Sequence, residues 1–350
     1  MVKKYATRAR KAKGAKIAKK PRKRKSQKFL KRTVPYRDLY EDGVTYSFLA
    51  QFLNCREQAR LSYVEGLRTE GLSVPLDFGI AFHECLEWTA SGKSVTTIGR
   101  KLGKLAQTKA KIKLRADERA TYQRLLRTVA AVYPLYHDYW SGRDHKKNYI
   151  YEEESFQFSY TSARGQTIPI RGRLDEAYID EDGAVVLQEN KTKGMIDEEA
   201  IRLMLSHDMQ TMLYCYALRN LTGKEPTRIL YNVIRRPAQR YTGSYRSKPE
   251  TESQFIARIQ DDVVARPQHY FMRWRVDLHK GDLDNWLSRV FDPLLDQVIR
   301  WWESIRKDPF NPWDSQEHYL NPEGLITKYG RSDFFNLITR GSYEGLELRR

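Results

Sequence analysis

The sequence is poor in cysteine and contains no long hydrophobic run. Its three cysteines, Cys55, Cys85 and Cys215, are widely spaced, so they predict a reducing compartment and no disulfide framework. No apolar segment is long enough for a signal peptide or a membrane span. A nucleophile elbow and a glycine-rich phosphate loop are also missing, which argues against a small-molecule hydrolase. We therefore expect a cytoplasmic protein without a membrane partner; its oligomeric state is unknown from the sequence.

Acidic residues are absent from the first 32 positions. This segment holds 16 of the 62 Lys and Arg residues, so the formal net charge of +18 falls to +2 without it. Because dense like charge opposes folding, we predict that residues 1–32 form a disordered basic arm. Such an arm would bind nucleic acid through counterion release. A solvated tail, a nuclear-type address and a mitochondrial presequence are the alternatives.

Residues 33–350 have a globular composition and are predicted to form a single domain. Helical periodicity covers 45–141, returns over 197–221, and dominates the C-terminal part, 249–350. Between them, the segment 149–237 forms the sheet core, with strands "YIYEEESFQFSY", "TIPIRGRLDEAYID", "AVVLQENK" and "TRILYNVIRRP". This order predicts an α/β fold in which helices flank a central mixed β-sheet.

Charged residues follow an apolar run directly in "VVLQENKTKG", residues 185–194. On a strand, Glu189 and Lys191 point to one face, and an Asp-Gly turn would bring Asp175 beside Glu189. Two carboxylates and the Asn190 carbonyl are oxygen donors that suit Mg²⁺. Lys191 would then assist a water that attacks a phosphodiester. A solvated strand face is the alternative, but buried ionisable groups at the end of an apolar strand favour a metal site.

These segments resemble the motifs of the PD-(D/E)XK nuclease superfamily, in its RecB-like branch of CRISPR adaptation nucleases and phage and mitochondrial single-strand exonucleases. "GIAFHECLE" is similar to the first motif and implies that His83 is a metal ligand, which would admit Mn²⁺ as well as Mg²⁺. "GRLDEAYID" and "VVLQENKTKG" imply that Asp175 and Glu189 bind metal and that Lys191 is catalytic. A satisfied core histidine is the alternative for His83.

A further motif, "DMQTMLYCYAL", resembles the Q-x-x-x-Y helix of the same branch, with Gln210 and Tyr214 one turn apart. The resemblance implies that both approach the DNA strand or the attacking water; packing and surface roles are the alternative. The residues expected to contact DNA are Gln210, Tyr214, Arg173, Lys193, Arg235 and Arg236.

Many relatives hold an iron–sulfur cluster with four cysteines, one before the histidine motif and three near the C-terminus. Cys55 stands where the first would be, but "NPEGLITKYGRSDFFNLI" has no cysteine, and Ser332 stands where one is expected. One thiolate cannot hold such a cluster. We expect no iron–sulfur cluster and a tail secured by Phe334, Phe335 and Leu337.

Tryptophans next to arginines, at Trp274, Trp301 and Trp302, suit base stacking, but tryptophans at helical spacing are more often core residues. The Lys/Arg-rich segment 100–127 would line a DNA channel or form a solvated helix face. Together, the motifs predict a divalent-metal-dependent deoxyribonuclease, an exonuclease on single strands or duplex ends. The alternative is a non-catalytic nucleic-acid-binding accessory protein that retains the fold. Replication, recombination and repair all remain open as its pathway.

Overall fold

The computed structural model describes residues 32–349, except 110–113, 145–146, 163, 244–248 and 328–329. The predicted basic arm, apart from Arg32, lies outside the described residues. Contacts separate residues 1–31 from a compact unit formed by 32–350, and the description below concerns that unit.

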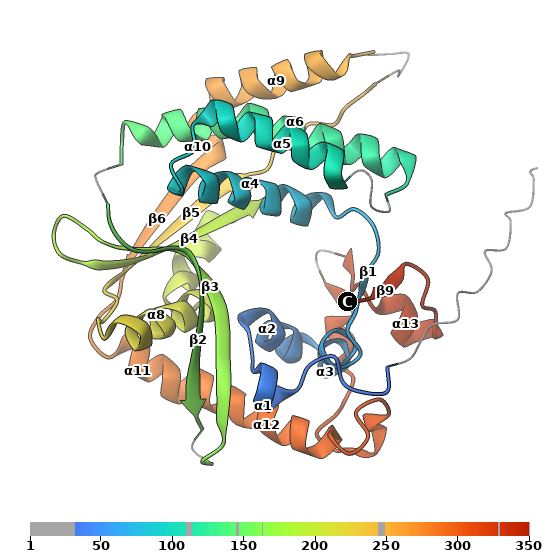
Figure 1. Ribbon diagram of the computed structural model, residues 1–350. Helices are drawn as coiled ribbons and strands as arrows, with labels where there is room; N and C mark the ends of the chain where they lie inside the picture. The colour runs from blue at the N-terminus through green and yellow to red at the C-terminus, as the bar shows by residue number, and fades with distance from the viewer. Residues whose placement is uncertain are drawn as a thin grey trace, which may run out of the picture. The chain divides into compact units, whose positions relative to one another are not determined.

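A five-stranded sheet runs through the middle of this unit, in the order β2-β3-β4-β5-β6 (Figure 1). The central pair, β4 and β5, is parallel, and the other neighbours are antiparallel. The mixed sheet between helices confirms the predicted fold class. The strand bounds are Asn148–Thr161 (β2), Thr167–Ile179 (β3), Val185–Lys193 (β4), Arg228–Arg235 (β5) and Phe271–Asp277 (β6).

The strand β4 has two faces covered by protein. Its first six residues, Val185 to Asn190, are all buried, as expected for a strand between two layers of helices. A tight turn joins it to β3, and Gly183 in that turn has a φ of 80°, which a residue without Cβ adopts without strain. The hairpin therefore fixes which β3 residues face the polar end of β4.

Helices cover both faces of the sheet (Figure 1). One layer contains α4 (Val74–Ala90), α5 (Val95–Lys109), α6 (Ala116–Ser141), α9 (Glu252–Ala265) and α10 (Pro267–Tyr270). The other contains α2 (Tyr46–Asn54), α8 (Met209–Thr222), α11 (Asp282–Trp286) and α12 (Asp292–Ile305). Each layer has its own hydrophobic core, one around Phe82 and Phe271 and the other around Leu213 and Leu295.

Shorter elements complete the unit. They are α1 (Leu39–Asp42), α3 (Arg56–Ala59), α7 (Glu198–Met204), α13 (Phe335–Arg340), β1 (Leu67–Thr69), β7 (Ile326–Thr327), β8 (Gly330–Arg331) and β9 (Leu346–Leu348). Segments of π-helix cover Arg60–Val64 and Leu287–Phe291, and 3₁₀ segments cover Leu205–His207, Pro312–Asp314 and Pro322–Gly324. The strand β1 pairs with β9, so the C-terminal segment returns to residues 67–69.

The helical pattern expected up to residue 141 is confirmed by the helices α5 and α6. Two local predictions were wrong. The helix expected to begin at residue 45 breaks at Cys55, which is extended (φ −165°). Residues 271–277 form the edge strand β6, which pairs antiparallel with β5; Phe271 and Trp274 are buried in it and Arg275 is exposed.

No helix in the described part of the chain is both long and apolar enough to cross a lipid bilayer.

Candidate active site

Asp175 and Glu189, called the acid pair below, lie where β3 and β4 separate. Regular pairing of the two strands ends at Glu176 and Gln188, and continuing that register places Asp175 opposite Glu189. The Asp175 Oδ2 atom accepts a hydrogen bond from the Asn190 N–H at 2.7 Å. The Asp175 carboxylate therefore accepts the hydrogen bond that a main-chain carbonyl of β3 would accept if the strands were still paired at Asn190.

The other oxygen of Asp175 faces the helix α4. His83 Nδ1 lies 3.7 Å from Asp175 Oδ1, so the histidine motif and the aspartate strand meet as predicted from the sequence. The helix can pass this close because Gly79, one turn before His83, faces β4: a Cβ there would lie 3.0 Å from Thr192 Oγ1.

Glu189 is fully enclosed, with 1% of its surface exposed. Its Oε1 atom accepts a hydrogen bond from Gln210 Nε2 of α8 at 2.7 Å and forms an ion pair with Lys191 Nζ. Its Oε2 atom is buried and receives no hydrogen bond from any residue that the structure describes. A buried carboxylate oxygen without a partner is costly, so this atom is suited to a cation.

The electrostatics of the site follow from burial and from the closeness of like charges. Burial, with repulsion from Asp175, raises the pKa of Glu189 to about 8, and burial also raises the pKa of Asp175. Burial alone would lower the pKa of Lys191, but attraction by Glu189 and Asp175 outweighs it and raises that pKa. Lys191 therefore favours its charged form, and it lies beside two carboxylates whose negative charges repel each other.

These donors fit a hard divalent cation that keeps part of its hydration. Within the described ranges, no three His, Cys, Asp or Glu side chains gather closely enough to form a metal site by themselves. Mg²⁺, however, commonly uses only one or two carboxylates and several waters. Asp175 and Glu189 supply the carboxylates, and the Asn190 carbonyl lies on the same strand edge as the N–H that contacts Asp175. His83 supplies an imidazole next to them.

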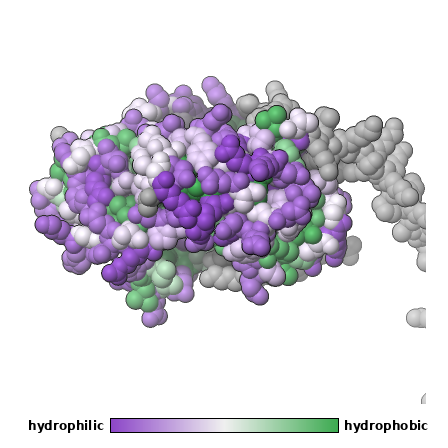
Figure 2. All heavy atoms as spheres, turned by 90° about the horizontal axis from the view of Figure 1, so that it is seen from below, coloured by the Kyte–Doolittle hydropathy of each residue, from purple (hydrophilic) through white to green (hydrophobic). Residues whose placement is uncertain are grey.

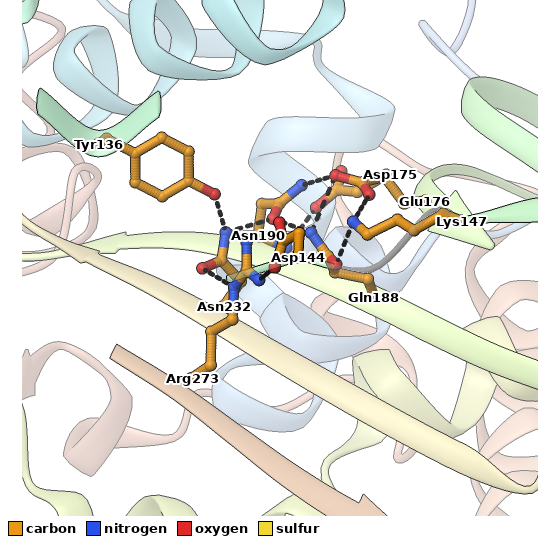
Figure 3. A network of polar contacts seen from close by, with 9 residues as sticks. All are labelled: Tyr136, Asp144, Lys147, Asp175, Glu176, Gln188, Asn190, Asn232 and Arg273. Atoms are coloured by element: carbon orange, nitrogen blue, oxygen red, sulfur yellow. Dashed lines mark hydrogen bonds and ion pairs between the residues drawn. The ribbon is translucent and has the colours of Figure 1, made fainter. Parts of the chain in front are cut away.

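The Asn190 side chain belongs to a polar network (Figure 3). Because successive side chains of a strand alternate, this network lies on the face of the sheet opposite to Glu189. Its Oδ1 atom accepts hydrogen bonds from Gln188 Nε2 at 3.0 Å and Asn232 Nδ2 at 2.7 Å. Asn232 also contacts the Tyr136 hydroxyl at 2.7 Å and Arg273 Nε at 3.1 Å. Only the main chain of Asn190 is therefore placed to bind a metal.

A further acid, Glu176, belongs to this network and not to the acid pair. It accepts hydrogen bonds from Lys147 Nζ at 2.6 Å and Gln188 Nε2 at 2.9 Å, so its charge is compensated (Figure 3). Sequence reasoning missed this network. The signal was there, because "QENK" places polar residues on both faces of β4 and Asn232 is a lone polar residue within the apolar strand β5.

The Q-x-x-x-Y helix contacts the acid pair through its glutamine. Tyr214 lies one turn after Gln210 on α8, and burial raises the pKa of its hydroxyl to about 12. The Tyr214 ring packs edge-on against Phe156, with ring centres 5.6 Å apart. A Cβ on Gly172 would lie 2.5 Å from Phe156 and 3.1 Å from Tyr214, so glycine leaves the space that these rings fill.

The basic residues expected to contact DNA lie in separate places. Arg173 pairs with Glu87 of α4 at 2.9 Å, and Lys193 lies 5.9 Å from the centre of the Tyr231 ring. Arg235 Nε donates to the carbonyl of His269 at 2.9 Å. Arg236 packs on Gly194, where a Cβ would lie 2.9 Å from its Nη2 atom. Lys193 is the last residue of β4, Arg235 is the last residue of β5, and Arg236 follows it. Contact between these three residues and DNA stays a prediction.

The three tryptophans considered for base stacking are core residues. Trp274, Trp301 and Trp302 are all buried, and Trp301 Nε1 donates to His318 Nδ1 at 3.1 Å. The molecular face seen from below in Figure 1, on the side of α12, is mainly hydrophilic with small separate hydrophobic patches (Figure 2). The helix α12 therefore turns its tryptophans inward.

The C-terminal segment packs against Cys55, which is buried. A Cβ on Gly324 would lie 2.3 Å from the carbonyl oxygen of Asn54 and 3.1 Å from Cys55 Cβ. The Leu325 carbonyl accepts a hydrogen bond from the Ser332 N–H at 2.8 Å. The segment around Leu325 therefore lies against Cys55 and the end of α2.

Phe334 is buried as expected, while Phe335 and Leu337 are half-buried. Polar contacts add to this packing. Glu57 accepts hydrogen bonds from Arg60 Nε at 2.7 Å and lies 3.0 Å from His318 Nε2, so a buried ionic cluster fastens residues near 318 to the segment after Cys55.

Comparison with known proteins identifies the family of the chain. The fold and the buried acid pair beside a lysine define an α/β protein with an E-x-K strand and an aspartate on the neighbouring strand. A family model of the PD-(D/E)XK nuclease superfamily matches residues 44–294, so the chain belongs to that superfamily. No curated protein matches it. A solved structure titled "Crystal structure of SSO0001" is 17% identical, covering 53% of this chain and 84% of its own, with a TM-score of 0.22.

Proposed function

We propose that this protein is a divalent-metal-dependent deoxyribonuclease that acts as an exonuclease on single strands or duplex ends. The observation that carries the proposal is Glu189, which is buried opposite Asp175 with one carboxylate oxygen unpaired and the other held by Lys191 and Gln210. A surface used only to bind nucleic acid gains nothing from two buried acids that face phosphates. Hydrolysis therefore accounts for this arrangement better than binding alone.

Each residue has a role that follows from its position. Asp175, Glu189, the Asn190 carbonyl and His83 would hold the cation, which supplies positive charge that polarises the phosphate and acidifies water. The Lys191 ammonium, kept charged by both acids, orients the attacking water and stabilises negative charge on the phosphate. Gln210 fixes the Glu189 carboxylate, and the Tyr214 ring packs beside it against Phe156.

The choice of DNA ends rests on less direct support. The resemblance to the RecB-like branch suggests single strands or duplex ends as substrates. The basic arm and the cations that follow β4 and β5 would attract the phosphate backbone.

A cleavage assay tests the proposal. End-labelled single-stranded and duplex DNA is incubated with the full chain in Mg²⁺, Mn²⁺ or EDTA. We expect cleavage from ends in either metal and none in EDTA. Asp175→Asn, Glu189→Gln and Lys191→Met should each reduce cleavage by at least about 10³-fold, because each removes part of one catalytic unit.

Matched controls separate this effect from a change in surface charge. Glu199 and Lys224 are exposed, so Glu199→Gln and Lys224→Met should cleave like the wild type. All five variants should retain DNA binding in EDTA. Binding without metal-dependent cleavage by the wild type would instead support the accessory-protein alternative.

A further inference from the structure

A cavity of about 170 Å³ lies between α4, α6, α9 and the segment after β5. Its apolar walls come from Val74, Phe78, Leu125, Phe255 and Ile259. Its polar lining comes from Thr121, Arg124, Thr128, Arg236 and Gln239, and Tyr241 adds an aromatic ring. Cavities that combine apolar and aromatic walls with a few polar groups are typical ligand sites.

The Tyr241 ring at the cavity is contacted by two neighbouring side chains. The guanidinium of Arg124 lies over the Tyr241 ring, 4.0 Å from its centre. The Phe255 ring also meets Tyr241 edge-on, with centres 5.6 Å apart. A planar group that enters here would meet a fixed aromatic surface and a cation, which is the chemistry that binds unpaired bases.

The charges at the cavity favour an anionic ligand. Two arginines line it, and the acids nearby already have cationic partners. Asp262 is paired with Arg266 at 2.7 Å, and Glu252 with Arg127. Arg124 forms a long ion pair with the same Glu252, with Nε 3.9 Å from Oε1 and no hydrogen bond, so Arg124 and Arg236 can both contact a phosphate.

One polar atom at the wall lacks a partner. The amide nitrogen of Gln239 donates to Asp262 and to the Tyr270 hydroxyl, which fixes the orientation of the amide. The Oε1 atom is then left buried, and no donor among the described residues meets it. An exocyclic amine of a nucleobase would satisfy such an acceptor.

The cavity is adjacent to the acid pair along two elements. Arg236 packs on Gly194, which follows Lys191 by three residues at the end of β4. On α4, Phe78 of the cavity precedes His83, which lies beside the acid pair, by five residues, or roughly 7.5 Å of helix. The cavity and the acid pair are therefore connected through α4 and the end of β4.

We infer that this cavity binds one unstacked nucleobase of the DNA strand, a base that carries an exocyclic amine, while Arg124 and Arg236 contact its phosphates. The inference rests on the proposed nuclease function and adds a subsite to it. Tyr241 stacks on the base, and Gln239 accepts a hydrogen bond from its amine. The subsite positions the strand and takes no part in hydrolysis.

Binding of single-stranded oligonucleotides in EDTA tests the inference. The probes are fluorescein-labelled oligodeoxyadenylates that carry one abasic site, moved along the strand, or one purine nucleotide without the 6-amino group. In the wild type, an abasic site at one position should weaken binding roughly tenfold. The amine-free purine at that position should weaken it by a smaller factor.

Two variants complete the cycle. Tyr241→Leu should bind the abasic and intact strands equally, and Gln239→Met should no longer distinguish adenine from the amine-free purine. Gln123→Met, on the exposed face of α6, should behave like the wild type. A flat scan in the wild type, or full discrimination in both cavity variants, would overturn the inference.

Cleavage measured in parallel separates the two proposals. A flat scan together with Mg²⁺-dependent cleavage removes the subsite and leaves the nuclease. A position-specific effect without cleavage supports the subsite and removes the nuclease.

Discussion

Replacing Gln210 with methionine should weaken metal binding at the acid pair. Gln210 Nε2 donates to Glu189 Oε1 at 2.7 Å, and Lys191 is the other described partner of that carboxylate. Methionine is similar in length but has no donor, so the variant removes the hydrogen bond with little change in volume. The carboxylate then loses its fixed orientation toward Asp175.

The expected size of the effect follows from the contact. A hydrogen bond to a charged acceptor is worth about 1.5–3 kcal/mol. Since about 1.4 kcal/mol is tenfold in affinity, we expect the metal affinity to fall about 10- to 100-fold, as for other residues that orient a ligand. Without the donor, the pKa of Glu189, already raised to about 8, should rise further. A proton then competes more strongly with the metal at neutral pH.

Thermal unfolding over a Mn²⁺ or Mg²⁺ titration, without DNA, measures this affinity. The concentration at half-maximal stabilisation should rise about 10- to 100-fold in Gln210→Met. Asn220→Ala is a suitable control, because Asn220 is exposed on the same helix and bonds only the Tyr216 carbonyl among the contacts described. An unchanged metal midpoint in Gln210→Met would refute the role assigned to this glutamine.

Three further predictions concern other parts of the chain. Gly172→Ala should lower stability by about 1–3 kcal/mol in urea unfolding and reduce cleavage, because the new methyl group displaces Phe156 and Tyr214; full activity would show that the position of Tyr214 is unimportant. Burial alone would raise the pKa of Glu57, but hydrogen bonds from its arginine and histidine partners outweigh it and lower that pKa below the ordinary 4.5. A lowered pKa gives stability that is present above pH 4.5 and lost as the pH falls below it, so Glu57→Gln should cost about 3 kcal/mol at pH 7 and less at pH 3.5, and a constant difference would contradict this. Deleting residues 1–32 should reduce the dependence of DNA affinity on salt, and an unchanged slope would remove the arm from binding.

The candidate site could be predicted where residues close in sequence share one strand or one helix. Glu189 and Lys191 are two apart on β4, and Gln210 and Tyr214 are four apart on α8, so backbone periodicity alone relates them. Asp175 could be added because a short Asp-Gly turn fixes the register of β3 against β4. His83 was placed only through the family resemblance, since nothing local ties α4 to β3.

The edge strand β6 and the C-terminal contacts were not predictable in the same way. The segment "FMRWRVD" alternates weakly, because arginines share its length with aromatic residues, and its pairing with β5 depends on a partner about 40 residues away. Similarly, Trp301 and Trp302 suit stacking or burial equally until α12 is packed. Such positions are decided by which surfaces remain to be covered once the sheet has formed.

The sequence by itself determined the class of fold, the two acids, the lysine and their order, because strand periodicity and tight turns act over a few residues. Only the tertiary structure decided that Glu189 is enclosed with one oxygen unpaired, that the Asn190 side chain faces away from the acid pair, and that a cavity forms between α4, α6 and α9. Those features arise where α4, α6, α8 and α9 pack on the sheet, and long-range packing sets burial and charge coupling that no short segment encodes.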